Sequence, residues 1–394
     1  MAFYETPAFF ILLALTAIPA VILGCLGKSI KRYGLVVSVV FLLLLFARDL
    51  PQMACFVFYL VWSFALTFIT LRAFKNKNPH AKALSHVTAL LSIAPLVIYK
   101  ISAAFDGNIL GFLGISYITF KSVQVILEVR DGLIEEMKPL DYIYFLIFFT
   151  PFTSGPIMRS RDFVEDLNRE LAPDEYKRMA VKGILFIVGG AVYKYIFSVL
   201  FSQAMWFLPE WFGHASAGAA ALAELSQGWS YVFYMFFDFA GYSLMAVGAG
   251  CLFGVKVPMN FRAPFRSLDM KDFWDRWHIS LSHWLRDYVF MRISRVCFEK
   301  KLFKSRLTVA SLGFMANFLL MGVWHGLTWD CLIYGIYHGV LLSLTEIYQR
   351  KSKFYKKHKN GKVYRAVSWF VTMNLVMIGM AIFSGQVATI LGLH

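Results

Sequence analysis

Two histidines in apolar surroundings are the residues of this chain best suited to chemistry. His325 follows Trp324 in the segment MGVWHG (321–326), and His278 lies 47 residues earlier in FWDRWHISLSHWLRDYVF (273–290). An ionisable side chain inside an apolar run is by default a candidate for function. An imidazole titrates at about pH 6.5, so it can serve as a general base where a hydroxyl must lose its proton. The alternative for each histidine is a buried imidazole hydrogen-bonded to a neighbour.

The segment around His278 predicts a continuous amphipathic helix over residues 273–290. Its polar residues fall into two neighbouring stripes at helical spacing. The first stripe contains Asp275, His278, Ser282 and Arg286, and the second contains Arg276, Ser280, His283 and Asp287. Such a helix suits an interface or a wet cavity better than lipid. Asp275 and Ser282 are the neighbours expected to orient His278.

Three further polar residues are weaker candidates. His338, thirteen residues after His325, either faces the same cavity or packs as a structural histidine, and His283 carries no catalytic prediction. Asp238 lies in an otherwise apolar segment, where a charge is costly unless it is paired. We expect it to pair with Tyr242, Ser243 or Lys194. A structural clamp is favoured over a catalytic acid.

The composition predicts an all-α, multi-pass integral membrane protein. Of 394 residues, 58% are hydrophobic and only 16% are charged, whereas about 25% are charged in soluble domains. A membrane-spanning helix needs roughly 20 apolar residues. We predict about eleven transmembrane helices and additional amphipathic helices around a central cavity, in a single domain (1–394) with a catalytic core at about 140–345. The predicted spans are Pro7–Leu26, Tyr33–Ala47, Pro51–Leu71, Leu84–Tyr99, Phe112–Leu127, Tyr142–Ile157, Val181–Phe207, Tyr231–Phe253, Val309–Trp329, Cys331–Ile347 and Ala366–Phe383.

The charge pattern predicts topology and partners. Basic residues follow the first apolar run and none precedes it, which reverses the layout of a signal peptide and places the amino end outside. The net charge is +15, and we expect the basic loops to be cytoplasmic and to lie against anionic membrane lipids. A second interpretation is that one basic loop docks an acidic protein. Nucleic acid is not an expected partner, because no soluble domain presents the basic residues.

Other chemistries leave no trace in the sequence. The five cysteines are scattered without a C-x-x-C pair, and the chain lacks the serine-hydrolase, phosphate-loop, zinc-protease and dinucleotide motifs. We therefore expect no covalent serine mechanism, no metal and no bound cofactor.

Several motifs together resemble the membrane-bound O-acyltransferase (MBOAT) family. The most specific are WHISLS (277–282) and MGVWHG, supported by NFRAPFRSLDMKDFW (260–274) and FFDFAGYS (236–243). The resemblance covers nearly the whole chain and implies that His325 is catalytic, with His278 acting beside it. The fuller match, which includes SGPIMRSRDF (154–163) and the opening segment 3–24, is similar to the family members that pass D-alanine towards teichoic acids.

The resemblance also implies a reaction and its partners. The donor would be D-alanine held as a thioester on the 4'-phosphopantetheine of an acidic cytoplasmic carrier protein, and the acceptor a hydroxyl of lipoteichoic acid outside a Gram-positive-type cell membrane. Arg292–Arg306, which alternates basic and apolar residues, is the expected carrier-docking segment, and a small helper membrane peptide is a further expected partner. The alternatives are an O-acetyltransferase of an exported polysaccharide and a transporter of the activated carrier. The transporter would require discontinuous helices and repeat symmetry.

Overall fold

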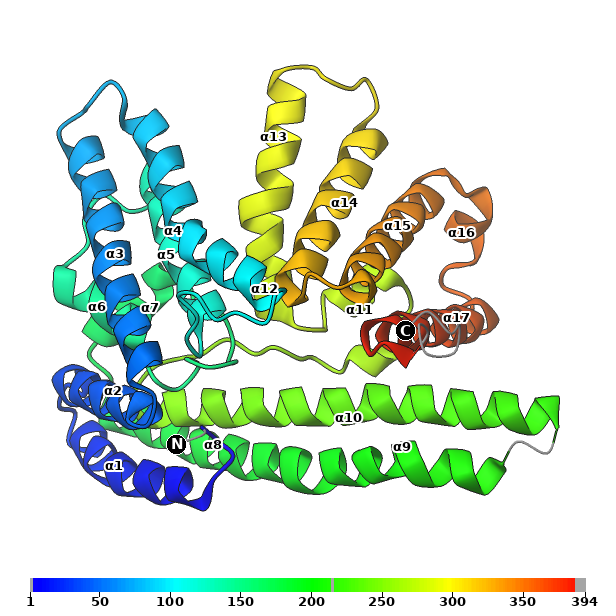
Figure 1. Cartoon of the computed structure of the whole chain (residues 1–394), viewed down its shortest axis with the longest axis horizontal. Coiled ribbons are helices and arrows are strands. Elements are labelled where there is room, and N and C mark those ends of the chain that lie inside the picture. The colour runs from blue at the N-terminus through cyan, green and yellow to red at the C-terminus, as the bar shows by residue number, and fades with distance from the viewer. Residues whose placement is uncertain (1–2, 214–215, 387–394) are drawn as a thin grey trace. The chain divides into compact units, whose positions relative to one another are not determined.

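The chain folds into helices joined by short loops. The structure, a computed structural model, describes residues 3–213 and 216–386, and no strand occurs within these two ranges (Figure 1). The described residues form two units. The first unit contains residues 3–191 and 241–259, and the second contains the described residues of 192–240 and 260–386.

The first unit is built from eight helices and the end of a ninth. Their bounds are α1 (Pro7–Cys25), α2 (Lys31–Phe46), α3 (Leu50–Lys75), α4 (Ala81–Ala103), α5 (Ile115–Arg130), α6 (Pro139–Ile147), α7 (Ser160–Asn168), α8 (Pro173–Val192) and the last part of α10 (Ala217–Leu252). Pro139 begins α6, a position where the missing N–H of proline costs nothing.

Buried hydroxyl groups connect four helices of the first unit. Ser122 on α5 hydrogen-bonds to Ser63 on α3 and to Ser92 on α4, each at 2.8 Å. The hydroxyl of Tyr142 on α6 reaches Ser63 at 2.7 Å and Thr67 at 2.8 Å. All five residues are fully buried. Because lipid chains offer no hydrogen bonds, hydroxyl groups in such a protein pair across helices.

The second unit contains the remaining helices. Their bounds are η1 (Tyr193–Phe197), α9 (Ser198–Phe212), the first part of α10, η2 (Pro264–Arg266), α11 (Met270–Trp274), α12 (Ile279–Leu285), η3 (Arg286–Phe290), α13 (Met291–Glu299), α14 (Arg306–His325), α15 (Trp329–Lys351), α16 (Lys353–His358) and α17 (Lys362–Phe383). Within this unit α9 runs beside α10 (Figure 1), with the rings of Phe201 and Phe237 stacked at 5.5 Å.

Eight helical stretches among the described residues are long and apolar enough to cross a membrane. They correspond to eight of the eleven predicted spans. The predicted spans Tyr33–Ala47 and Phe112–Leu127 are helices, but α2 and α5 have only 16 residues each. The predicted span Tyr142–Ile157 was wrong, because α6 ends at Ile147. Apolar composition alone does not distinguish a spanning helix from a buried segment that turns.

Glycines allow α14 and α15 to pack with their backbones in contact. A Cβ added to Gly335 on α15 would lie 2.5 Å from the carbonyl oxygen of Phe318 on α14. A Cβ on Gly322 of α14 would likewise overlap the carbonyl oxygen of Cys331. Gly326, four residues after Gly322, lies just beyond the helix as its C-cap. Small residues permit this kind of contact between membrane helices.

We predict that Gly335→Ala destabilises the protein by about 1–3 kcal/mol, the usual cost of overpacking a tight contact. The matched control is Gly189→Ala on α8, where an added Cβ meets no atom within 4 Å. Alanine favours a helix over glycine by about 0.5–1 kcal/mol, so the control should be neutral or stabilising. Thermal unfolding in detergent measures both, and equal effects would contradict the packing argument.

Candidate active site

His325 ends α14 and lies among aromatic rings. Its imidazole is 4.6 Å from the indole of Trp324, 4.9 Å from the ring of Phe383 on α17 and 6.1 Å from that of Tyr334 on α15, measured between ring centroids. Gly326 follows as the C-cap with an extended backbone. The side chain is half-buried. The imidazole is thus partly exposed and partly covered by the aromatic side chains around it.

His278 lies in a turn between α11 and α12, not in a helix. Its backbone is left-handed, with φ 45° and ψ 50°, a conformation that costs energy for any residue with a Cβ. Its side chain is only 5% exposed, and its ring meets the ring of Phe239 edge-on at 4.7 Å. Strained backbone geometry of this kind occurs often at functional sites.

The predicted helix over residues 273–290 was therefore wrong, and so was the polar stripe of Asp275, His278, Ser282 and Arg286. The helix stops at Trp274 and restarts at Ile279. Backbone hydrogen bonds to residues 260–262 replace the missing helical bonds: Arg262 N–H donates to the Arg276 carbonyl, and Ile279 N–H donates to the Asn260 carbonyl. No glycine or proline marks this break, because it is imposed by a distant segment.

The two histidines flank the same indole. The ring of Trp324 lies 6.4 Å from that of His278 and 4.6 Å from that of His325. The structure thus brings together two residues that are 47 positions apart in the chain. Among the described residues, the Nε2 atoms of His278 and His338 are both buried without a hydrogen-bond partner. A buried polar atom without a partner is rare and calls for an explanation.

Burial controls the charge of His278. Removal from water lowers the pKa of His278 to about 3, and the nearby charge of His325 acts in the same direction. Burial disfavours the charged form of an imidazole, and a second cation disfavours it further. His278 is therefore neutral at physiological pH. A neutral imidazole carries one N–H donor and one acceptor nitrogen.

His338 is a packed histidine. It is fully buried on α15, and its Nδ1 accepts a hydrogen bond of 3.3 Å from the indole N–H of Trp274 on α11. Its ring lies 4.6 Å from that of Tyr334. Of the two interpretations left open by the sequence, the contacts favour the structural one.

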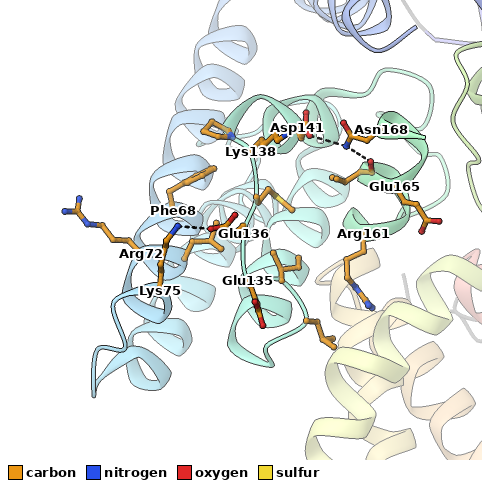
Figure 2. Close-up of a pocket in the computed structure, with 16 residues that line it drawn as sticks. Phe68, Arg72, Lys75, Glu135, Glu136, Lys138, Asp141, Arg161, Glu165 and Asn168 are labelled. Carbon is orange, nitrogen blue, oxygen red and sulfur yellow. Dashed lines mark hydrogen bonds and ion pairs between the residues drawn. The ribbon is translucent and has the colours of Figure 1, made fainter. Parts of the chain in front are cut away.

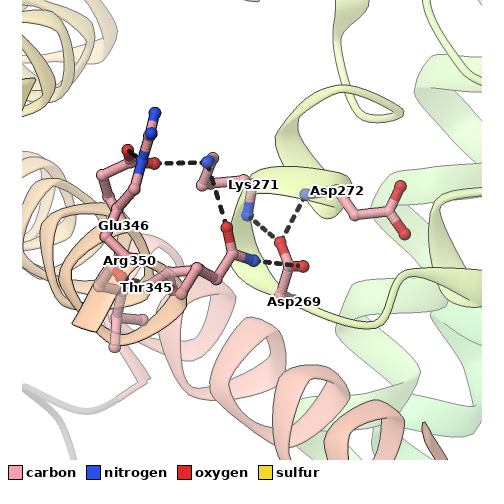
Figure 3. A network of polar contacts seen from close by, with 8 residues as sticks. Asp269, Lys271, Asp272, Thr345, Glu346 and Arg350 are labelled. Carbon is pink, nitrogen blue, oxygen red and sulfur yellow. Dashed lines mark hydrogen bonds and ion pairs between the residues drawn. The ribbon is translucent and has the colours of Figure 1, made fainter. Parts of the chain in front are cut away.

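A second set of polar contacts, besides the bond from Trp274 to His338, joins α11 to α15. The ammonium group of Lys271 contacts the Glu346 carboxylate at 2.5 Å and the side-chain oxygen of Gln349 at 3.2 Å (Figure 3). The Gln349 amide donates to Asp269 at 2.9 Å, and Asp269 accepts from two backbone N–H groups at the start of α11. Together with the bond from Trp274 to His338, this network holds the segment just before His278 on α15.

The remaining polar candidates are paired or lie elsewhere. Asp238 forms an ion pair of 2.6 Å with Lys194, so one of its predicted partners is confirmed. The next residue, Phe239, supplies the ring against His278. His283 lies half-buried in α12. The sequence drew no attention to Tyr334, Phe383 or the side chain of Asn260. For Asn260, the indication in the sequence was its place at the start of the NFRAPF motif.

The first unit contains an open groove of about 900 Å³ (Figure 2). It is lined by the end of α3, the loop after α5 and one face of α7. Its charged side chains comprise four basic residues, Arg72, Lys75, Lys138 and Arg161, and four acidic residues, Glu135, Glu136, Asp141 and Glu165. Lys75 is paired with Glu136 at 2.8 Å. The groove therefore offers no excess of either charge.

Comparisons with known proteins identify the family of this chain. The model of the MBOAT, membrane-bound O-acyltransferase family matches residues 44–385. The chain is 38% identical to the teichoic acid D-alanyltransferase of Bacillus subtilis, over 97% of this chain and 98% of that protein. It is 35% identical to the protein of the same name from Streptococcus thermophilus, over 97% and 94%. A peptidoglycan O-acetyltransferase of Helicobacter pylori is 28% identical over 63% of this chain and 44% of its own length.

The family match includes both histidine segments, and the eight apolar helices suit a multi-pass protein of the cell membrane. The chain belongs to the membrane-bound O-acyltransferase family.

Proposed function

We propose that this enzyme transfers a D-alanyl group from a thioester on a carrier protein's phosphopantetheine arm to a hydroxyl of teichoic acid. The observation that carries the proposal is the match along nearly the full length of two proteins named teichoic acid D-alanyltransferase. The O-acetyltransferase alternative shares the histidine argument, but the O-acetyltransferase relatives are only 27–29% identical, over 63–83% of this chain. Transport of the activated carrier has no comparable support.

The proposed chemistry needs a base and a stabiliser for developing negative charge. The acceptor hydroxyl attacks the thioester carbonyl while its proton passes to the imidazole of His325. The tetrahedral intermediate then collapses: the carbon–sulfur bond breaks, the new ester remains, and the sulfur leaves with the proton returned from His325. Since a thioester is converted to an oxygen ester, no external energy source is needed, and the phosphopantetheine arrives on the donor, not as a bound cofactor.

His278 is proposed to stabilise the intermediate. Its neutral state and its buried Nε2 fit a hydrogen-bond donor aimed at the position where the carbonyl oxygen gains charge. The indole N–H of Trp324 is the alternative donor beside it. The indole of Trp277 stacks on Phe273 at 5.4 Å and is only 4% exposed, so we assign it a packing role in this scheme.

We propose Arg292–Arg306 as the docking segment for the acidic carrier. Basic residues alternate there with exposed apolar side chains: Val296, Phe298, Leu302 and Phe303 are each more than 40% exposed. The groove of the first unit is less suited, because its four basic side chains are matched by four acidic ones. An acidic partner is attracted by a surface with an excess of positive charge.

A small helper membrane peptide is a further proposed partner, as the first acceptor of the acyl group. Reconstitution with radiolabelled D-alanyl carrier distinguishes these routes. Label on lipoteichoic acid supports direct transfer, and label on a small protein supports the helper. Transfer from a labelled acetyl donor, offered in a parallel reaction, with none from the D-alanyl carrier would favour the O-acetyltransferase alternative.

We predict that His325→Asn abolishes most transfer while the protein stays folded. Asparagine nearly preserves size and hydrogen bonding but takes up no proton near neutral pH, so general-base catalysis worth about 10²- to 10⁴-fold is lost. The measurement is D-alanyl transfer by reconstituted protein of unchanged thermal stability. His283→Asn is the matched control and should remain active. Near-normal transfer by folded His325→Asn would end the assignment of the base.

We predict that His278→Asn lowers the rate without changing the shape of the pH profile. Asparagine tolerates the left-handed backbone. Because the pKa of His278 is lowered to about 3, its imidazole takes up no proton as the pH falls from about 8 to about 5. The acid limb of kcat/KM must therefore come from another group. Loss of that limb in His278→Asn would show that His278 itself titrates.

We predict that Lys300→Glu with Lys301→Glu weakens carrier binding roughly tenfold at low salt, the equivalent of about 1.4 kcal/mol. The difference from the unmodified protein should shrink as salt is added, because salt screens exposed charges. The matched control is Lys356→Glu with Lys357→Glu on α16, which is also basic and exposed. Equal weakening by both pairs would point to nonspecific attraction, and unchanged binding by the first pair would move the docking site to residues 159–178.

A further inference from the structure

The left-handed turn at His278 is closed by one distant residue, Asn260. The Asn260 backbone carbonyl accepts the N–H of Ile279 at 2.9 Å. Its side-chain Oδ1 accepts the hydroxyl of Ser280 at 2.6 Å and the backbone N–H of Ser280 at 3.3 Å. Asn260 is 1% exposed and Ser280 is 7% exposed. Three hydrogen bonds, all shielded from water, therefore hold the two residues that directly follow His278.

These bonds replace an ordinary helix cap. The residue that precedes a helix usually accepts, through its own side chain, one of the first free N–H groups of that helix. His278 occupies that position before α12 and makes no such bond. Asn260 supplies the acceptor instead. As a result the imidazole of His278 is not used for capping and lies against Phe239 and Trp324.

The segment that carries Asn260 is itself anchored within the second unit. The indole N–H of Trp369 on α17 donates to the Phe265 carbonyl at 2.8 Å, and the hydroxyl of Ser368 donates to the Leu268 carbonyl at 2.6 Å. On the other side of the turn, Arg262 N–H donates to the Arg276 carbonyl at 3.0 Å. Residues 260–262 thus hydrogen-bond to the chain on both sides of His278, at Arg276 before it and at Ile279 and Ser280 after it.

We propose that Asn260 and Ser280 are positioning residues that fix the imidazole of His278 for acyl transfer. This inference rests on the proposed role of His278. Three bonds from a fixed segment hold a backbone conformation that a histidine does not adopt by preference. Without them the turn relaxes, the ring moves away from its place beside Trp324, and the reacting carbonyl loses a correctly placed donor. A misplacement of about 1 Å at a reacting centre costs up to roughly 100-fold in rate.

The test compares Asn260→Leu, which removes the side-chain acceptor at similar size, with Ser280→Ala and Ser280→Thr. Threonine retains the hydroxyl and should restore what alanine loses. Ser267→Ala is the matched control: Ser267 is fully buried in the same segment, and its hydroxyl donates within its own turn, to the Pro264 carbonyl at 2.7 Å. The first readout is acyl transfer by the folded, full-length protein. We expect kcat to fall roughly 10- to 100-fold in Asn260→Leu, with KM unchanged, and less in Ser280→Ala.

A second readout does not depend on activity. Diethyl pyrocarbonate modifies accessible imidazoles, and mass spectrometry follows His278 and the fully buried His338 in the same sample. Modification of His278 should accelerate in Asn260→Leu and Ser280→Ala, but not in Ser280→Thr or Ser267→Ala, while that of His338 stays unchanged. Unaltered modification of His278 in folded Asn260→Leu overturns the proposal, and so does faster modification with an unchanged kcat.

A double variant separates this inference from the proposed function. If Asn260 acts through His278, adding Asn260→Leu to His278→Asn causes no further loss of rate. A full additional loss overturns the positioning role. Full activity of His278→Asn alone would refute the proposed role of His278, and the positioning role would fall with it. Loss in His278→Asn with full activity of Asn260→Leu would refute the inference alone.

Discussion

Polar groups in this protein depend on partners within the protein, because the surrounding lipid offers none. In the first unit the hydroxyls of Ser63, Ser92 and Ser122 meet at a junction of three helices. In the second unit Lys194 pairs with Asp238, and Trp274 donates to His338. Against this background the buried Nε2 of His278, like that of His338, is an exception among the described residues, because it has no hydrogen-bond partner.

The same constraint explains why the second unit is joined by polar contacts at defined points. Lys271, Glu346 and Gln349 connect α11 to α15 near one end of α15, while Trp274 and His338 connect the same two helices further along. The second contact lies in an aromatic setting, where the Trp274 ring is 4.8 Å from that of Phe318. The polar contacts fix the orientation of α11 on α15, and the aromatic packing around Trp274 and His338 keeps the second contact away from water.

Sequence reasoning predicted the all-helical membrane architecture and the two histidine segments, because both depend on local composition. It also predicted that Asp238 would need a partner, and Lys194 is that partner. It failed where a distant segment decides the local structure. The residues around His278 have a helical pattern, yet Asn260 and Arg262 hold them in a turn. Likewise, residues 142–157 are apolar enough for a span, but α6 ends at Ile147. The roles of His325 and His278 remain predictions.

The glycine contacts between α14 and α15 have a consequence for motion. Where Gly322 and Gly335 bring backbone atoms together, neither helix slides along the other without separating the pair. His325 at the end of α14 is therefore carried on a rigid hairpin. The turn that bears His278 is held by hydrogen bonds and by ion pairs that are partly open to solvent, such as Lys271 with Glu346. We expect both histidines to fluctuate less than the exposed loops of the second unit, so that the two imidazoles keep their places beside Trp324.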